Sequence, residues 1–219
     1  MNNRKSQYDK KGMYNGYDKK NKEREALDYY STPTEEVTNI LNTLNIDFND
    51  KTILEPCAGG GHMLKAIQDY VNDSAGLIAT DIKKRTLCDP NLSIETGKEF
   101  DFLSDNYPYT DDIDYIIMNP PYAVIEPFVM KSLSIVNKGI IMLGRLQFLE
   151  GEARYKNIFK LCPPTDVYVY VDRIACFRNG DLSIKPDSVQ AYAWFVWNLE
   201  EENPETKIHW IRRNNKKTP

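Results

Sequence analysis

The sequence lacks any long apolar run, and no stretch approaches the length of a membrane-spanning helix. Its first 25 residues, MNNRKSQYDKKGMYNGYDKKNKERE, also lack the apolar middle segment of a signal peptide. Low-complexity tracts and internal repeats are missing as well. We therefore expect a cytoplasmic protein that has no membrane partner.

Cysteine is scarce, and no two cysteines have the CxxC spacing of a zinc or redox site. Free thiols in a reducing compartment are the expected state, and no metal site is predicted. The four cysteines are Cys57, Cys88, Cys162 and Cys176.

A strong overall charge is also absent, since the net charge is only −4. The distribution of charge is more informative. Basic residues crowd the first 25 positions and recur between Lys207 and Lys217, which leaves the middle of the chain acidic. Two interpretations stay open: solvated tails, or tails that contact nucleic-acid phosphates.

The 219 residues suit one domain with a sizeable core. Residues 1–27 carry no apolar periodicity and are interpreted as a flexible basic arm. Residues 28–212 are predicted to form a single domain, and residues 213–219 a basic tail.

The first helix is predicted to begin in the stretch YSTPTEE, residues 30–36. Thr32 can cap it, Pro33 suits its first position, and Glu35 stands where a capping box needs an acidic residue. Apolar residues then recur at spacings of three and four, which predicts one buried helical stripe. These residues are Val37, Ile40, Leu41 and Leu44.

Short apolar segments alternate with helical patterns along the rest of the domain. This alternation predicts an α/β protein with a doubly wound, mostly parallel sheet. The expected strands are 51–56, 76–80, 93–96, 113–118 and 139–144, with helices following 61 and 125 and another at 155–161. Segments 166–177 and 188–199 are strand-like and predict an antiparallel C-terminal hairpin at one edge, which 207–211 extends.

Polar and glycine-rich segments follow four of these strands. They are the glycine turn EPCAGGG (55–61), Asp81 in ATDI, Asp101 in FDFL, and the Asn-Pro-Pro-Tyr corner at 119–122. Each segment alone also suits a plain turn or a helix cap. Together they should meet at the carboxyl edge of one sheet, where open α/β sheets bind ligands.

These motifs, in this order after YSTP, resemble the adenine DNA methyltransferases that use S-adenosylmethionine and carry Asn-Pro-Pro-Tyr. The closing segment AYAWFVW (191–197) resembles the small phage and prophage type. The resemblance covers roughly residues 28–200 and implies a Rossmann-like fold with S-adenosyl-L-methionine as cofactor. It implies methyl transfer to the 6-amino group of adenine in DNA, with DNA methylation in a restriction-modification or phage context.

The resemblance also implies a set of cofactor-binding residues. Thr32 and Pro33 would lie at the methionine end of the cofactor, and Asp81 would hold its ribose. Asp101 would accept a hydrogen bond from the amino group of the cofactor's adenine. The full set is Tyr30, Thr32, Pro33, Glu55, Pro56, Cys57, Ala58, Gly59, Gly61, Asp81, Ile82, Asp101 and Phe102. Cys57 is interpreted as a small hydrophobe, not as a nucleophile.

The Asn-Pro-Pro-Tyr corner supplies the expected catalytic groups, Asn119, Pro120, Pro121 and Tyr122. Two oxygen acceptors, the Asn119 amide and the Pro120 carbonyl, can hold an amino group in line with a methyl donor. Tyr122 would stack on a flipped base, with Phe177 as the second stacking ring. For Phe177, a plain core role is an equal alternative.

Two alternative hypotheses assume the same methyl transfer with a different substrate, RNA or a protein glutamine, because Asn-Pro-Pro-Tyr also occurs in methyltransferases of these substrates. A catalytically silent nucleic-acid-binding subunit is a further alternative. No separate recognition domain follows the closing strand, so recognition is assigned to loops near 123–127, 145–165 and 178–189 or to the tails. This suits a short target site or a homodimer, and a companion restriction enzyme stays open.

Overall fold

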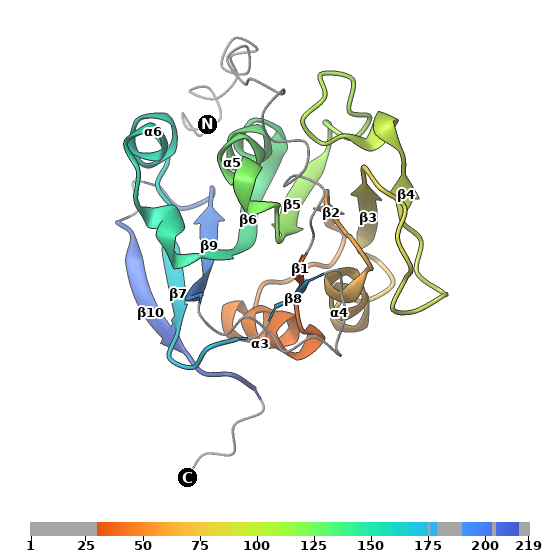
Figure 1. Cartoon of the computed structure of the whole chain (residues 1–219), viewed down its shortest axis with the longest axis horizontal. Helices are drawn as coiled ribbons and strands as arrows, with labels where there is room; N and C mark the ends of the chain where they lie inside the picture. Colours follow the sequence, from red (N-terminus) through yellow and green to blue (C-terminus); the bar gives the residue numbers. More distant parts are fainter. Residues whose placement is uncertain (1–29, 175, 179–189, 203–204, 215–219) are drawn as a thin grey trace.

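The computed structural model describes residues 30–174, 176–178, 190–202 and 205–214. Its strands are β1 (Tyr30–Ser31), β2 (Thr52–Glu55), β3 (Gly76–Asp81), β4 (Glu95–Thr96), β5 (Ile113–Met118), β6 (Val136–Arg145), β7 (Asp166–Tyr170), β8 (Phe177–Arg178), β9 (Tyr192–Asn198) and β10 (Lys207–Ile211). Its α-helices are α3 (Thr34–Leu44), α4 (His62–Tyr70), α5 (Ile125–Ile135) and the short α6 (Glu152–Arg154). Figure 1 shows one central sheet with helices packed around it.

Eight strands form that sheet, in the order β10-β7-β9-β6-β5-β2-β3-β4. Within the stretch β6-β5-β2-β3-β4, every pair of adjacent strands is parallel. Their carboxyl ends therefore meet at one edge, as the sequence predicts. The remaining two strands, β1 and β8, form a separate antiparallel pair.

The C-terminal strands change direction. Strand β9 lies between β6 and β7 and runs antiparallel to both. Strand β10 then pairs with β7 in parallel at the outer edge. The predicted fold class, a mostly parallel α/β sheet with antiparallel C-terminal strands, is confirmed.

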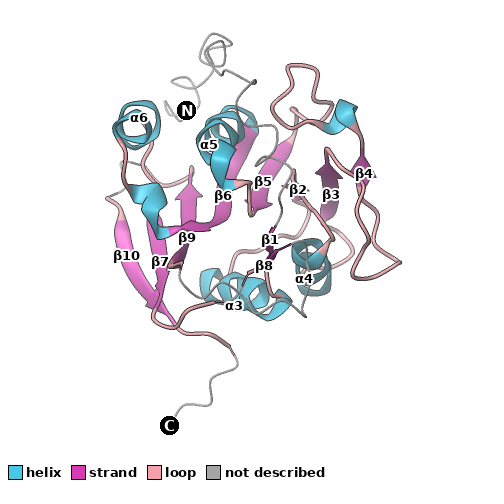
Figure 2. Cartoon of the chain, in the orientation of Figure 1, coloured by secondary structure: helices cyan, strands magenta, loops and turns pink. Residues whose placement is uncertain are grey.

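Helices cover both faces of the sheet (Figure 2). On one face α3 and α4 bury their apolar stripes, including Val37, Ile40 and Ile67, against alternate sheet residues. On the other face α5 packs Phe128 and Val129 against the intervening sheet residues. Such two-sided burial explains why the central strands have nearly continuous apolar sequences.

One local prediction was wrong, and one helix has other bounds than expected. Helix α3 begins at Thr34 with Pro33 in the cap position, and no side chain caps it. The Thr32 hydroxyl is instead held by Asn119, so the capping box does not form. The helix expected at 155–161 begins earlier, as α6 at Glu152, and continues as a π-helical turn over Tyr155–Phe159.

None of the helices in the described ranges has both the length and the apolar character that crossing a bilayer requires. The predicted arm at 1–27 and most of the 178–189 loop and the 213–219 tail lie outside the described residues.

Candidate functional site

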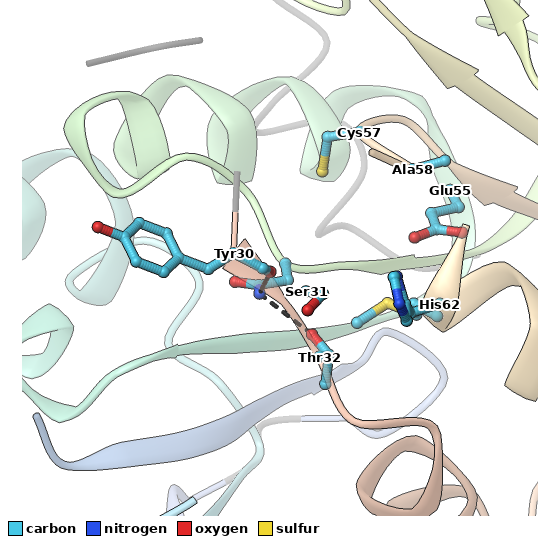
Figure 3. A pocket seen from close by; sticks show the side chains of 9 residues that line it. Tyr30, Ser31, Thr32, Glu55, Cys57, Ala58 and His62 are labelled. Atoms are coloured by element: carbon cyan, nitrogen blue, oxygen red, sulfur yellow. Dashed lines mark hydrogen bonds between the residues drawn. The ribbon is translucent and has the colours of Figure 1, made fainter. Parts of the chain in front are cut away.

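A hollow opens at the carboxyl edge of the sheet, between the β1 segment and the turn that follows β2 (Figure 3). In Figure 3, Glu55, Ala58 and His62 approach it from one side, and the backbone of Tyr30, Ser31 and Thr32 crosses the other. Its empty volume, which includes the open solvent at its mouth, is about 280 Å³. The lining residues are Tyr30, Ser31, Thr32, Glu55, Cys57, Ala58, His62, Met63 and Asn119.

The side-chain amide of Asn119 has a fixed orientation in this hollow. Its Nδ2 donates to the Tyr30 carbonyl at 2.9 Å and to Thr32 Oγ1 at 3.1 Å. A carbonyl oxygen can only accept, so nitrogen must be the amide atom that faces Tyr30. The Asn119 oxygen therefore points the other way, where it can accept a hydrogen bond from a ligand.

The glycine turn after β2 is tied to the end of β3. Asp81 is buried, and its Oδ2 accepts a hydrogen bond from the Gly59 backbone at 2.8 Å while Oδ1 accepts one from Lys83 at 2.8 Å. Gly59 and Gly61 adopt φ of 58° and 82°, a region that disfavours side chains. A Cβ at Gly61 would also lie 2.7 Å from Leu92 Cδ1. Asp81 thus shapes the turn directly.

Glu55 carries a buried carboxyl group with unused bonding capacity. Its side chain is 2% exposed, and its Oε2 has no hydrogen-bond partner. Burial, followed by the charge of Asp81, raises the pKa of Glu55 to about 8, and a hydrogen bond from the Leu64 backbone opposes the rise. A buried polar atom without a partner is costly, so this atom indicates a place for a polar ligand group.

His62 is a pocket residue that the sequence reasoning missed. It is the first residue of α4, and its Nδ1 is buried without a hydrogen-bond partner. Burial lowers the pKa of His62, which favours the neutral ring. A histidine directly after the last glycine of the turn was the available signal.

The other residues of the glycine turn have simpler roles. Ala58 is buried and lines the hollow, and Cys57 lines it while packing against the core beside Asn119. Burial, together with the charges of Glu55 and Asp81, raises the pKa of the Cys57 thiol. A neutral thiol is a poor nucleophile, which agrees with the interpretation of Cys57 as a small hydrophobe. Pro56, between Glu55 and Cys57 in the sequence, does not line the hollow.

The residues assigned to the adenosine end lie beyond the hollow. Ile82 is 38% exposed next to Asp81 and offers an apolar surface for a ring. Asp101 Oδ1 accepts a hydrogen bond from the Leu103 backbone at 3.0 Å. Phe102 is buried in the core against Tyr107 and Phe128. The cofactor contacts assigned to these three residues stay predictions.

Tyr122 does not present an open ring in this structure. Its ring stacks on Tyr30, with centroids 5.8 Å apart and an interplanar angle of 26°. The guanidinium carbon of Arg145 lies 4.4 Å from its centroid, and the Tyr192 ring is 6.1 Å away. A base that stacks on Tyr122 must therefore displace one of these neighbours or use the remaining part of the ring.

Phe177 lies in β8, where its backbone pairs with Ser31, but its side chain is outside the described part of the structure. The prediction that it stacks on a base stays a prediction. Pro33, at the cap of α3, follows Thr32 directly and does not itself line the hollow. Within the described ranges, no group of three or more His, Cys, Asp or Glu side chains is placed to hold a metal ion.

Comparison with known proteins gives the fold a context. No protein-family model matches the chain, and no curated protein matches its sequence. The methyltransferase subunit of a type I restriction-modification system from Streptococcus thermophilus superposes with a TM-score of 0.61 and 13% identity. That match covers 84% of this chain and 47% of the other, so this chain spans about half the length of that protein.

Two further solved structures are similar. One is a protein from Pyrococcus horikoshii assigned as an RNA methyltransferase, with a TM-score of 0.55, 16% identity and coverage of 82% of this chain and 90% of that one. The other, from Listeria monocytogenes, is assigned as a class I S-adenosylmethionine-dependent methyltransferase, with a TM-score of 0.53, 10% identity and coverage of 81% and 62%. At these identities the likeness establishes a Rossmann-like methyltransferase fold.

Proposed function

We propose that this protein transfers a methyl group from S-adenosylmethionine to the 6-amino group of adenine in DNA. The observation that carries the proposal is the Asn119 amide, whose nitrogen is bound by Tyr30 and Thr32 while its oxygen faces away from both. This arrangement places a fixed acceptor at the end of β5, beside the hollow that the glycine turn lines.

The residues of the hollow, together with Asp81 and Ile82 beyond it, suit the cofactor. The unpartnered Glu55 Oε2 and His62 Nδ1 offer contacts for the polar amino-acid end. Asp81 holds the glycine turn open at Gly59 and keeps lone pairs for the ribose hydroxyls. Ile82 supplies the exposed apolar surface that the adenine ring would cover. When bound, S-adenosylmethionine supplies an activated methyl group on a sulfonium.

The chain's own task is then to orient a weak nucleophile. An exocyclic adenine nitrogen shares its lone pair with the ring, so it must be aligned with the methyl group and drawn toward tetrahedral geometry. Asn119 and the Pro120 carbonyl each accept one of its two N–H groups. These hydrogen bonds strengthen as positive charge develops on the nitrogen, so they favour the transition state over the ground state.

The substrate assignment to DNA rests on the Asn-Pro-Pro-Tyr corner preceded by the Tyr-Ser-Thr-Pro box, which the structure joins through Asn119 and Thr32. The restriction-modification methyltransferase subunit among the similar structures supports DNA, whereas the Pyrococcus protein keeps RNA as the second candidate. A duplex adenine has to leave the base stack to reach such a site.

The test is transfer of labelled methyl groups to duplex DNA, ribosomal RNA and protein in parallel, followed by digestion and nucleoside analysis. We expect label in N6-methyladenine from DNA, with Asn119→Ala as the inactive control. Label in RNA nucleosides alone would move the assignment to RNA. A protein that binds no S-adenosylhomocysteine in calorimetry would be a silent binding subunit.

A further inference from the structure

Arg145 is the last residue of β6, the strand that pairs in parallel with β5. The register aligns Met142 with Met118, the last residue before the Asn-Pro-Pro-Tyr corner. Arg145 therefore follows β6 at the same sheet edge where the corner follows β5. Its cross-strand partner on β9 is Tyr192.

The guanidinium group of Arg145 lies against the aromatic side of the corner. Its carbon is 4.4 Å from the centroid of Tyr122, within the range of a cation–π contact. It is also close to the Tyr192 hydroxyl: burial raises the pKa of Tyr192 to about 12, and Arg145 opposes that rise. Two rings next to the proposed base site thus surround one planar cation.

Among the described residues, this cation has no acidic partner. None of the ion pairs in the described residues includes Arg145, and its Nε is buried without a hydrogen-bond partner. A half-buried guanidinium without a counter-ion is costly, unless an anion binds there during function. Arginine is the side chain best suited to a phosphate, because its planar fork matches two phosphate oxygens.

We propose that Arg145 binds the backbone phosphate next to the target adenine and, through its contact with Tyr122, positions the ring on which that base stacks. This inference rests on the proposed function and adds a substrate-binding residue to its site. A nucleotide that enters the corner brings its base to Tyr122, and its own phosphate is the nearest anion.

The test uses a short single strand of thymines with one central adenine, because a single-stranded base needs no flipping. Binding is measured by fluorescence anisotropy, with S-adenosylhomocysteine present, over a range of salt concentrations. Arg145→Gln should weaken binding about tenfold at low salt, as expected for a lost hydrogen bond to a charged group. It should also reduce the log–log salt slope by about 0.7, the contribution of one phosphate on a single strand.

The matched control is Lys138→Gln, which removes the same charge near the opposite end of the same strand, where Lys138 pairs with Glu200. This control should keep the wild-type slope. Arg145→Lys should also keep the slope, since the charge remains, but should lower the rate of methyl transfer because the planar contact with Tyr122 is lost. Equal slopes for wild type and Arg145→Gln, or equal losses in both Gln variants, would overturn the proposal.

A second measurement needs no variant, so it decides the matter if Arg145→Gln does not fold. Uncharged methylphosphonates replace the phosphates that flank the single adenine, and binding to the wild-type protein should weaken by a similar factor. Unchanged affinity would refute the phosphate contact. Wild-type protein that binds neither S-adenosylhomocysteine nor the strand would instead count against the proposed function itself.

Discussion

The Asn119 side chain donates a hydrogen bond to the Thr32 hydroxyl at 3.1 Å, across 87 positions of sequence. The bond joins the two short motifs that the sequence places at opposite ends of the N-terminal half of the domain. Thr32 does not cap α3, because Pro33 occupies the cap position and the Thr32 hydroxyl contacts Asn119 instead. The Tyr-Ser-Thr-Pro box therefore acts as a support for Asn119 in this structure.

Replacing Thr32 with Val should lower the rate of methyl transfer while the fold is kept, because valine has the same shape and no hydroxyl. The loss of one neutral hydrogen bond to the Asn119 amide corresponds to about 1 kcal/mol, or roughly fivefold in rate. Thr32→Ser keeps the hydroxyl and should stay near the wild-type rate. Single-turnover kinetics with saturating cofactor would measure this, and equal rates for the Val and Ser variants would contradict it.

Changing Asn119 itself should separate catalysis from cofactor binding. Asn119→Ala removes the acceptor for the target amine, so methyl transfer should fall about 100-fold or more, as for other donors and acceptors aimed at a transition state. Affinity for S-adenosylhomocysteine should remain close to wild type. Asn119→Asp should be equally inactive, since a carboxylate cannot donate to the Tyr30 carbonyl.

Calorimetry on these variants gives the affinity for S-adenosylhomocysteine, and transfer assays on the same preparations give the rate of methyl transfer. If the Ala variant loses cofactor affinity and activity to the same extent, Asn119 belongs to the cofactor site and its assigned role is wrong.

Asp81→Asn should weaken cofactor binding. The carboxylate accepts the Gly59 and Lys83 backbone N–H groups, and an amide can accept only one of them without a clash of donors. A loss of about tenfold in affinity for S-adenosylhomocysteine is expected, the size of one hydrogen bond to a charged group. The control is Asp47→Asn, an exposed aspartate that accepts the Asn49 backbone N–H in the same local pattern.

Glu55 should make the ligand-free protein less stable as pH rises. Its pKa is raised from 4.5 to about 8, so between these values the folded protein holds a proton that the unfolded chain has released. The stability contribution is complete below about pH 4.5 and is lost as pH rises through about 8. One such group changes the free energy of unfolding by at most about 1.4 kcal/mol per pH unit.

Urea denaturation of wild type and Glu55→Gln at several pH values between 5 and 9 tests this expectation. Subtracting the two curves cancels the other buried acids, such as Glu36, whose pKa burial also raises. The free energy of unfolding of the wild type minus that of Glu55→Gln should decrease as pH rises through about 8. A difference that is constant over this range would show that Glu55 titrates normally in the folded protein.

Much of the fold could be predicted because apolar periodicity reports burial directly. The stripe of Val37, Ile40 and Leu41 and the apolar runs of β5 and β6 lie where the pattern indicates. The motif positions at strand ends predicted the shared edge of the sheet. These two signals predict a doubly wound, mostly parallel α/β sheet, and the family resemblance adds the Rossmann-like methyltransferase fold.

The details that the sequence did not predict depend on contacts between distant segments. The orientation of the Asn119 amide depends on its hydrogen bonds to Thr32 and Tyr30. The ring of Tyr122 is contacted by the guanidinium of Arg145, which comes from another strand. His62 gave no periodic signal, and its place directly after the last glycine of the turn was the one available indication. Burial and unpartnered atoms become visible only when the chain is folded.

The most direct test is nucleoside analysis of DNA from cells that have no adenine methylation of their own and express either this chain or its Asn119→Ala variant. The account predicts N6-methyladenine in DNA from the wild-type cells and none from the variant. Wild-type DNA without N6-methyladenine, or equal amounts in both, would contradict the claim that Asn119 presents an adenine amine to the methyl donor.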